Sequence, residues 1–96
     1  MDNAEAAALL KDHLAAYRLR PYSELLTLLG KPQLAELRSA SGRSYQVEVE
    51  VFWDGRPGGA LRVLGSIDDG GWRALCPLSD DFILAPDGRF VGERAP

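Results

Sequence analysis

Y-Q-V-E-V-E-V-F-W, residues 45–53, alternates between two kinds of side chain and decides the fold class. Its odd-numbered positions carry Tyr, Val and Trp, whereas Gln and Glu occupy most of the even-numbered ones. A period of two over this length, built from β-branched and aromatic residues, is typical of a strand and not of a helix. We therefore expect an antiparallel sheet with one face on a core and the other facing water or a partner.

The residues before this strand predict two helices. Asp2 followed by Glu5 resembles a capping box, which places a helix start at Asp2. An apolar stripe at helical spacing then runs to about residue 18. It consists of Ala6, Leu9, Leu10, His13, Leu14 and Tyr17. Pro21 suits the first turn of a second helix, and Gly30 and Pro32 end the helical part. The apolar face of that second helix would be Tyr22, Leu25, Leu26 and Leu29.

The remainder of the chain predicts short strands separated by turns. We expect strands at residues 34–40, 44–53, 60–67, 72–76, 82–84 and 90–91. Turns are expected at residues 41–43, 54–59, 68–71 and 86–88, which are rich in Gly, Pro, Asp and Ser. Pro77 ends the 72–76 strand or marks it as an edge strand. The shared phase of these strands predicts one core beneath the helices, formed by Val47, Val49, Val51, Leu61, Val63 and Trp72.

These elements predict an α+β fold: two N-terminal helices packed on an antiparallel β-meander of about four to six strands. Ninety-six residues suit a single domain. We assign it to residues 1–96, with a helical part at 1–30 and a β-rich part at 33–93.

Composition excludes several classes of protein. The net charge of −3 comes from 14 acidic and 11 basic residues, without the basic stripe that nucleic-acid binding requires. The single cysteine, Cys76, cannot form an internal disulfide. No apolar run approaches the roughly 20 residues that span a bilayer, and the N-terminus lacks the pattern of a secretory signal. We expect a cytoplasmic protein that contacts neither membrane nor nucleic acid.

Few residues are candidates for chemistry. His13 could act as a base, but it lies on the apolar stripe, where a half-buried core histidine is the simpler interpretation. Cys76 falls on the inward phase, which favours a buried, inert thiol. One histidine and one distant cysteine do not predict a zinc site. Trp53 and Trp72 are interpreted as core anchors. We predict no catalytic residue, metal or cofactor.

The acidic pairs Asp68-Asp69 and Asp80-Asp81 are the remaining chemical candidates. Two carboxylates can hold Ca²⁺ or Mg²⁺, or serve as an acid and a base. Both pairs lie at predicted turns or strand starts, however, where Asp is favoured because it hydrogen-bonds nearby backbone amides. The glycine pairs at residues 58–59 and 70–71 form no phosphate loop, because no helix follows them. Gly65, inside a strand, marks a bulge or a close helix approach.

The outward phase of the sheet predicts a possible contact surface. If Ile67 pairs with Trp72 across the 68–71 turn, Leu64 faces Leu75, with Phe52 nearby. These apolar groups would form a patch with a charged rim of Glu48, Glu50, Arg62 and Arg73. A clustered patch suggests a protein contact. The alternative is incidental exposure, or cover by the C-terminal strands.

From Gly58 to Glu93 the chain resembles small uncharacterised bacterial proteins. The stretches that carry the resemblance are G-G-A-L-R-V-L-G-S-I-D-D-G-G-W-R, P-L-S-D-D-F-I-L and P-D-G-R-F-V-G-E. The span from Gly58 to Glu93 covers a little over a third of the chain. The resemblance implies a bacterial, cytoplasmic setting and no activity, cofactor or site.

The absence of a predicted catalytic set favours a non-catalytic protein-interaction module, of an accessory, regulatory or immunity type. Its partner would be another protein or a second copy of the chain. The alternative is a small-molecule-binding domain with a pocket between helices and sheet. A third possibility is a carboxylate-dependent enzyme that uses the aspartate pairs.

Overall fold

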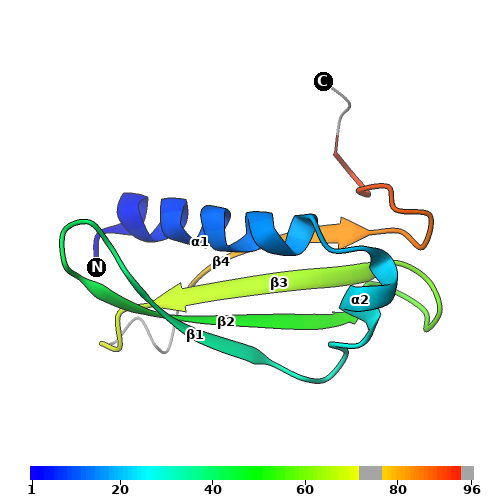
Figure 1. The fold of residues 1–96 in the computed structure, drawn as a ribbon, viewed down its shortest axis with the longest axis horizontal. Helices are drawn as coiled ribbons and strands as arrows, with labels where there is room; N and C mark the ends of the chain where they lie inside the picture. The colour runs from blue at the N-terminus through cyan, green and yellow to red at the C-terminus, as the bar shows by residue number, and fades with distance from the viewer. Residues whose placement is uncertain (72–76, 94–96) are drawn as a thin grey trace.

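The computed structural model describes residues 1–71 and 77–93. In these residues the helices are α1 (Asn3–Arg18) and α2 (Tyr22–Leu26), and the strands are β1 (Gln33–Arg38), β2 (Ser44–Trp53), β3 (Leu61–Asp68) and β4 (Leu78–Leu84). The strands form one antiparallel sheet in the order β1-β2-β3-β4. Helix α1 lies across one face of this sheet (Figure 1). The predicted α+β class is confirmed.

Helix α1 begins and ends where the sequence predicts. The Asp2 carboxylate caps it by accepting a hydrogen bond from the Glu5 backbone N–H at 3.1 Å. Such a cap satisfies a donor that has no partner within the helix. The apolar stripe faces the sheet, and its buried members are Ala6, Leu10, Leu14 and Tyr17. The stripe therefore supplies the helix side of the core.

Helix α2 is shorter than predicted. It contains five residues, of which Leu25 is buried whereas Leu26 is 37% exposed. Leu29 lies beyond the helix and forms a parallel bridge with Val51 of β2. Gly30 then adopts φ +70°, the left-handed conformation that glycine tolerates at a chain reversal, as predicted.

Strand β2 has the predicted bounds and pairs with β1 so that Ala35 faces Val47 and Leu37 faces Tyr45. The inward phase of β2 and β3 is buried beneath α1. The predicted core residues Val47, Val49, Val51, Leu61 and Val63 are at most 3% exposed, which confirms their shared phase. Trp72, the sixth predicted member, lies outside the described residues. Trp53 is partly buried against the core.

Gly65 lies on the inner face of β3, directly beneath α1. A Cβ atom built on it would be 2.8 Å from Leu10 Cδ1 and 3.0 Å from Leu14 Cδ2. Both distances are shorter than an ordinary carbon–carbon contact of about 3.5–4.0 Å. Gly65 therefore marks a close helix approach, one of the two expected roles.

The neighbour of β3 differs from the prediction. Ile67 pairs with Leu78 and Leu64 pairs with Asp81, whereas the sequence predicted Trp72 and Leu75 as their partners. The expected strand at residues 72–76, which includes Cys76, lies outside the described residues. Strand β4 takes the position next to β3 because it brings two large apolar side chains, Phe82 and Leu84, into the core at 3% exposure each. It therefore starts four residues before the predicted 82–84 strand.

The C-terminal segment is attached to β4 and to the end of α1. Phe90 bridges to Leu84, and the Val91 N–H donates to the Ile83 carbonyl at 2.8 Å, so that the predicted 90–91 strand is a single bridge. The Arg18 guanidinium lies 4.9 Å from the centre of the Phe82 ring and 5.0 Å from that of Phe90. Stacking of this kind adds a cation–π attraction to apolar packing.

Candidate interaction surface on the outer sheet face

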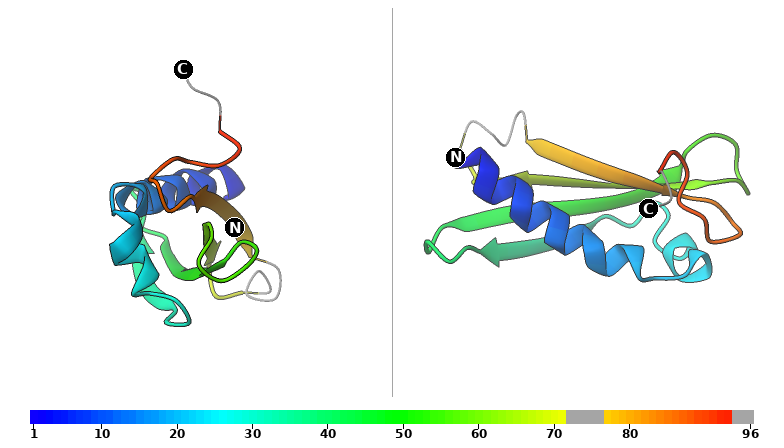
Figure 2. Two further views of the ribbon diagram at one scale, coloured as in Figure 1. Left: turned by 90° about the vertical axis from the view of Figure 1, so that its right-hand side faces the viewer. Right: turned by 90° about the horizontal axis from the view of Figure 1, so that it is seen from above.

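The face of the sheet opposite α1, here called the outer face, has no covering helix or strand within the described part of the chain (Figure 2). The pairing register identifies the side chains on this face. They are Leu34, Glu36 and Arg38 from β1, Ser44, Gln46, Glu48, Glu50 and Phe52 from β2, Arg62, Leu64, Ser66 and Asp68 from β3, and Ser79, Asp81 and Ile83 from β4.

Three apolar side chains lie close together on this face. Phe52, Arg62 and Ile83 are aligned across β2, β3 and β4. Leu64 lies two residues along β3 and is a diagonal neighbour of both Phe52 and Ile83, a separation that large side chains can bridge. Phe52, Leu64 and Ile83 are called the outer apolar cluster below. Phe52 is 37% exposed, and Leu34 on β1, the first strand in the sheet order, is 76% exposed.

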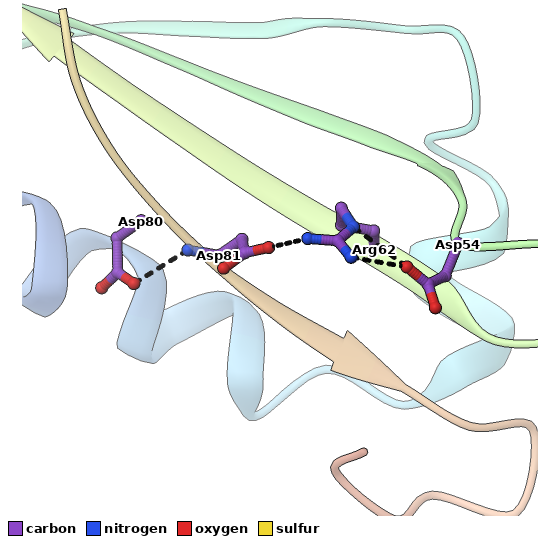
Figure 3. Close-up of polar contacts among 4 residues, drawn as sticks. All are labelled: Asp54, Arg62, Asp80 and Asp81. Atoms are coloured by element: carbon purple, nitrogen blue, oxygen red, sulfur yellow. Dashed lines mark hydrogen bonds and ion pairs between the residues drawn. The ribbon is translucent and has the colours of Figure 1, made fainter. Parts of the chain in front are cut away.

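Arg62 lies within this cluster and is held by two carboxylates (Figure 3). Its Nε and Nη2 atoms donate to Asp54 Oδ1 at 3.0 and 2.7 Å, and its Nη1 atom donates to Asp81. The hydrogen bond to Asp54 is the main reason that the pKa of Arg62 is raised. The guanidinium therefore stays charged, and its position between two fixed carboxylates leaves it little freedom to pair elsewhere.

Glu48 and Glu50 lie two residues apart on the same face of β2, and neither forms an ion pair with any described residue. The pKa of the Glu48 carboxyl is raised, first because it shares a hydrogen bond with the Glu50 carboxyl, and then by burial and by repulsion from Glu50. Two carboxyl groups this close disfavour simultaneous ionisation. A cation placed beside this pair would relieve the repulsion between the two carboxyl groups.

A depression of about 330 Å³ lies beside Glu48. It is lined by Leu34, Gln46, Val47, Glu48, Ser66, Asp68 and Pro77. Two of these residues are acidic, and two more offer an amide or a hydroxyl group. We call it the acidic depression. It combines an apolar wall with hydrogen-bonding groups and negative charge.

The structure brings together five of the seven residues that the sequence analysis proposed for a protein interface. These are Phe52, Leu64, Glu48, Glu50 and Arg62, all on the outer face. Arg73 and Leu75 lie outside the described residues. Sequence reasoning missed Leu34 and Ile83. Leu34 could have been found, since it alternates with the inward Ala35. Ile83 lies in the predicted 82–84 strand, but its position beside Arg62 depends on the register between β3 and β4, which the sequence did not predict.

His13 is half-buried on α1, as expected, with its ring centre 5.7 Å from that of Tyr17. Burial lowers the pKa of His13, which favours the neutral form of its imidazole. Asp68 Oδ1 and Asp69 Oδ1 accept from the backbone N–H groups of Gly70 and Gly71 at 2.8 and 3.2 Å, the turn role predicted for them.

Asp80 and Asp81 lie inside β4 and not at its start, which corrects the expected turn position. Their side chains point to opposite faces of the strand. Asp80 Oδ1 accepts from the Asp81 N–H at 2.8 Å, while the Asp81 carboxylate binds Arg62 (Figure 3). The strand extends through these acidic residues because Phe82 and Leu84 anchor it in the core. Over residues 1–71 and 77–93, no group of three or more His, Cys, Asp and Glu side chains is placed to hold a metal ion.

A second depression, of about 400 Å³, lies between α1 and the β1–β2 loop. Its lining consists of Glu5, Ala8, Leu9, Asp12, Ser39, Ala40 and Ser41. The Ser41 hydroxyl lies 2.9 Å from a Glu5 carboxylate oxygen and 2.7 Å from the Ser39 hydroxyl. The pocket alternative expects a pocket between the helices and the sheet, whereas this depression is lined by α1 and by a loop, without strand residues.

Comparisons with models of protein families, with curated proteins and with solved structures find no match to this chain. Neither helix in the described residues is long and apolar enough to cross a membrane.

Proposed function

We propose that this chain is a non-catalytic protein-interaction module, of an accessory, regulatory or immunity type, that binds its partner through the outer face of the sheet. The observation that carries the proposal is the outer apolar cluster on a face that α1 leaves uncovered. The residues that form the contact are Phe52, Leu64 and Ile83, with the charged groups beside them.

Burial of the outer apolar cluster supports this function energetically. A large apolar side chain that becomes fully buried contributes roughly 1.5–3 kcal/mol. The cluster is already half-buried within the chain, so a partner would recover only part of that amount for each residue. Association costs about 4–15 kcal/mol in lost freedom. The cluster therefore needs polar contacts around it, and the carboxylates of the outer face that form no ion pair with a described residue are positioned to provide them.

Site-specific photo-crosslinking tests the proposal. A photoreactive phenylalanine analogue replaces Phe52 on the outer face, and in a matched control it replaces Ala15, which is exposed on α1. In cells of the source organism, we expect a discrete protein adduct from position 52 and none from position 15. Equal labelling from the two positions, or no adduct from position 52, would contradict the proposal.

A small-molecule-binding domain is the second candidate, and the depression between α1 and the β1–β2 loop favours it. Glu5 and Asp12 supply carboxylates there, and Ser39 and Ser41 supply hydroxyl groups, which together suit a small polar amine. A thermal-shift screen of polyamines and amino-alcohols tests this candidate, with Asp12→Asn as the variant that should lose any stabilisation. An unchanged melting temperature throughout the screen would count against it.

We further propose that the protein works in the bacterial cytoplasm. The resemblance of residues 58–93 to small bacterial proteins supports the source, and the single cysteine suits a reducing compartment. Expression in a bacterial host followed by cell fractionation tests the location. Recovery in the periplasmic fraction would contradict it.

A further inference from the structure

The negative charge of this protein is concentrated on the outer face. The paired strand residues on that face carry five carboxylates and two guanidinium groups, a formal charge of −3 on fifteen residues. All the other described residues together carry 9 acidic and 7 basic side chains, a formal charge of only −2. A partner with complementary charge would need positive groups opposite this face.

The charge is also unevenly neutralised across the face. Beside the outer apolar cluster, Arg62 binds both Asp54 and Asp81. Around the acidic depression, Glu48 and Asp68 form no ion pair with a described residue. The outer face thus has one end where carboxylates are paired with a guanidinium group and another end where they are not.

We propose that the occupant of the outer face is a basic protein surface, with apolar side chains against the outer apolar cluster and a Lys or Arg side chain in the acidic depression. This inference rests on the proposed function and adds the chemistry of the partner. The depression offers the inserted cation two carboxylates, from Glu48 and Asp68, and polar groups from Gln46 and Ser66. Its apolar wall at Leu34 suits the aliphatic stem of the same side chain.

A second copy of the chain is a poorer occupant of this face. Two copies placed face to face would oppose formal charges of −3 and −3. Like charges across an interface disfavour the pairing. A nucleic acid would meet the same repulsion from its phosphates. Charge complementarity therefore selects a basic protein from among these occupants.

Defined peptides test this inference. The probes are two soluble ten-residue peptides, one in which Arg alternates with Val and one in which Glu replaces each Arg. At low salt, the Arg peptide should bind at least roughly tenfold more tightly than the Glu peptide. Amide NMR shifts should change mainly in β2 and β3. Perturbations centred on α1, or equal binding of the two peptides, would overturn the inference.

Two double variants that change the net charge equally distinguish binding at the outer face from attraction of the Arg peptide to the overall charge of the protein. Glu48→Gln/Glu50→Gln removes two charges from the outer face, and Glu24→Gln/Asp87→Asn removes two from exposed positions elsewhere. We expect the first to weaken binding of the Arg peptide roughly tenfold and the second to change it less than about twofold. Equal losses in the two variants would mean that only net charge matters, which would overturn the inference.

Two further measurements distinguish failure of this inference from failure of the proposed function. In sedimentation velocity at neutral pH, the protein alone should be a monomer. A dimer that is lost on Leu64→Glu would make a second copy the occupant and overturn the basic partner. If a partner is crosslinked from position 52 but its contact peptide carries no Lys or Arg, the inference fails while the proposed function stands. If position 52 gives no adduct, both this inference and the proposed function are wrong.

Discussion

Gly65→Ala tests the close approach of α1 to the sheet. The added methyl carbon would lie 2.8 Å from Leu10 Cδ1 and 3.0 and 3.2 Å from the two Cδ atoms of Leu14. These leucines are 1% and 2% exposed, so their methyl groups have little room to move away. We therefore expect the helix or the leucine side chains to shift by a few tenths of an ångström, at a cost in stability.

The magnitude follows from two opposing effects. Overpacking of a well-packed core costs typically about 1–3 kcal/mol. Replacement of Gly by Ala within an element gains roughly 0.5–1 kcal/mol from the lower entropy of the unfolded chain. The expected net loss is about 1 kcal/mol, a sizeable part of a total stability of roughly 5–15 kcal/mol. It corresponds to a fall of about 4–8 °C in melting temperature.

Urea denaturation measures this loss, which should appear as a fall of roughly 0.3–1 M in the midpoint. Gly55→Ala is the matched control, because a Cβ atom there has no heavy atom within 4 Å. It should leave stability unchanged or raise it slightly. Leu10→Ala, alone and combined with Gly65→Ala, completes a double-mutant cycle, since the new methyl group should partly fill the cavity. We expect a coupling energy of about 1 kcal/mol in favour of the double variant.

If Gly65→Ala is as stable as Gly55→Ala and shows no coupling to Leu10→Ala, the reasoning is refuted. The glycine would then be dispensable, and α1 would not be held against β3 at this point.

Four other outcomes follow from the same structure. Val49→Asp places a charge at a fully buried position and should cost several kcal/mol in urea denaturation; a loss below about 0.5 kcal/mol would contradict the assigned inward face. Because the folded pKa of Glu48 is raised, the folded state binds this proton more tightly, so stability decreases as pH rises through that pKa. Glu48→Gln should therefore raise the melting temperature by about 1–3 °C at pH 7 and by less in acid, and a gain that is the same at every pH would exclude this cause. Arg62→Gln should lower the melting temperature by a few degrees, and this difference from the wild type should shrink in 1 M salt if the two ion pairs matter. Addition of Ca²⁺, Mg²⁺ or Zn²⁺ should leave the melting temperature within about 1 °C, whereas a large rise that is lost on Asp68→Asn/Asp69→Asn would reveal a metal site.

The sequence by itself determined the local elements and the phase of the central strands. The alternation from residue 45 to 53 predicts β2 with its observed bounds, because a period of two is a property of neighbouring residues. The cap at Asp2 and the reversal at Gly30 are local in the same way. Strand parity also places Phe52 and Leu64 on the outward phase, whichever strands lie beside them.

Only the tertiary structure decided which strand lies beside β3. The turn residues at 68–71 predict that the next few residues pair with β3, yet the described pairing belongs to β4. Phe82 and Leu84 fill the core opposite α1, and this non-local burial extends the strand through two aspartates. That register in turn places Ile83 in the outer apolar cluster and Asp81 beside Arg62. The neighbours of a residue across the sheet depend on the register of the strands, and the register depends on which side chains fill the core. The alternation within one strand therefore predicts which of its side chains face outward, but not which groups from other strands lie beside them.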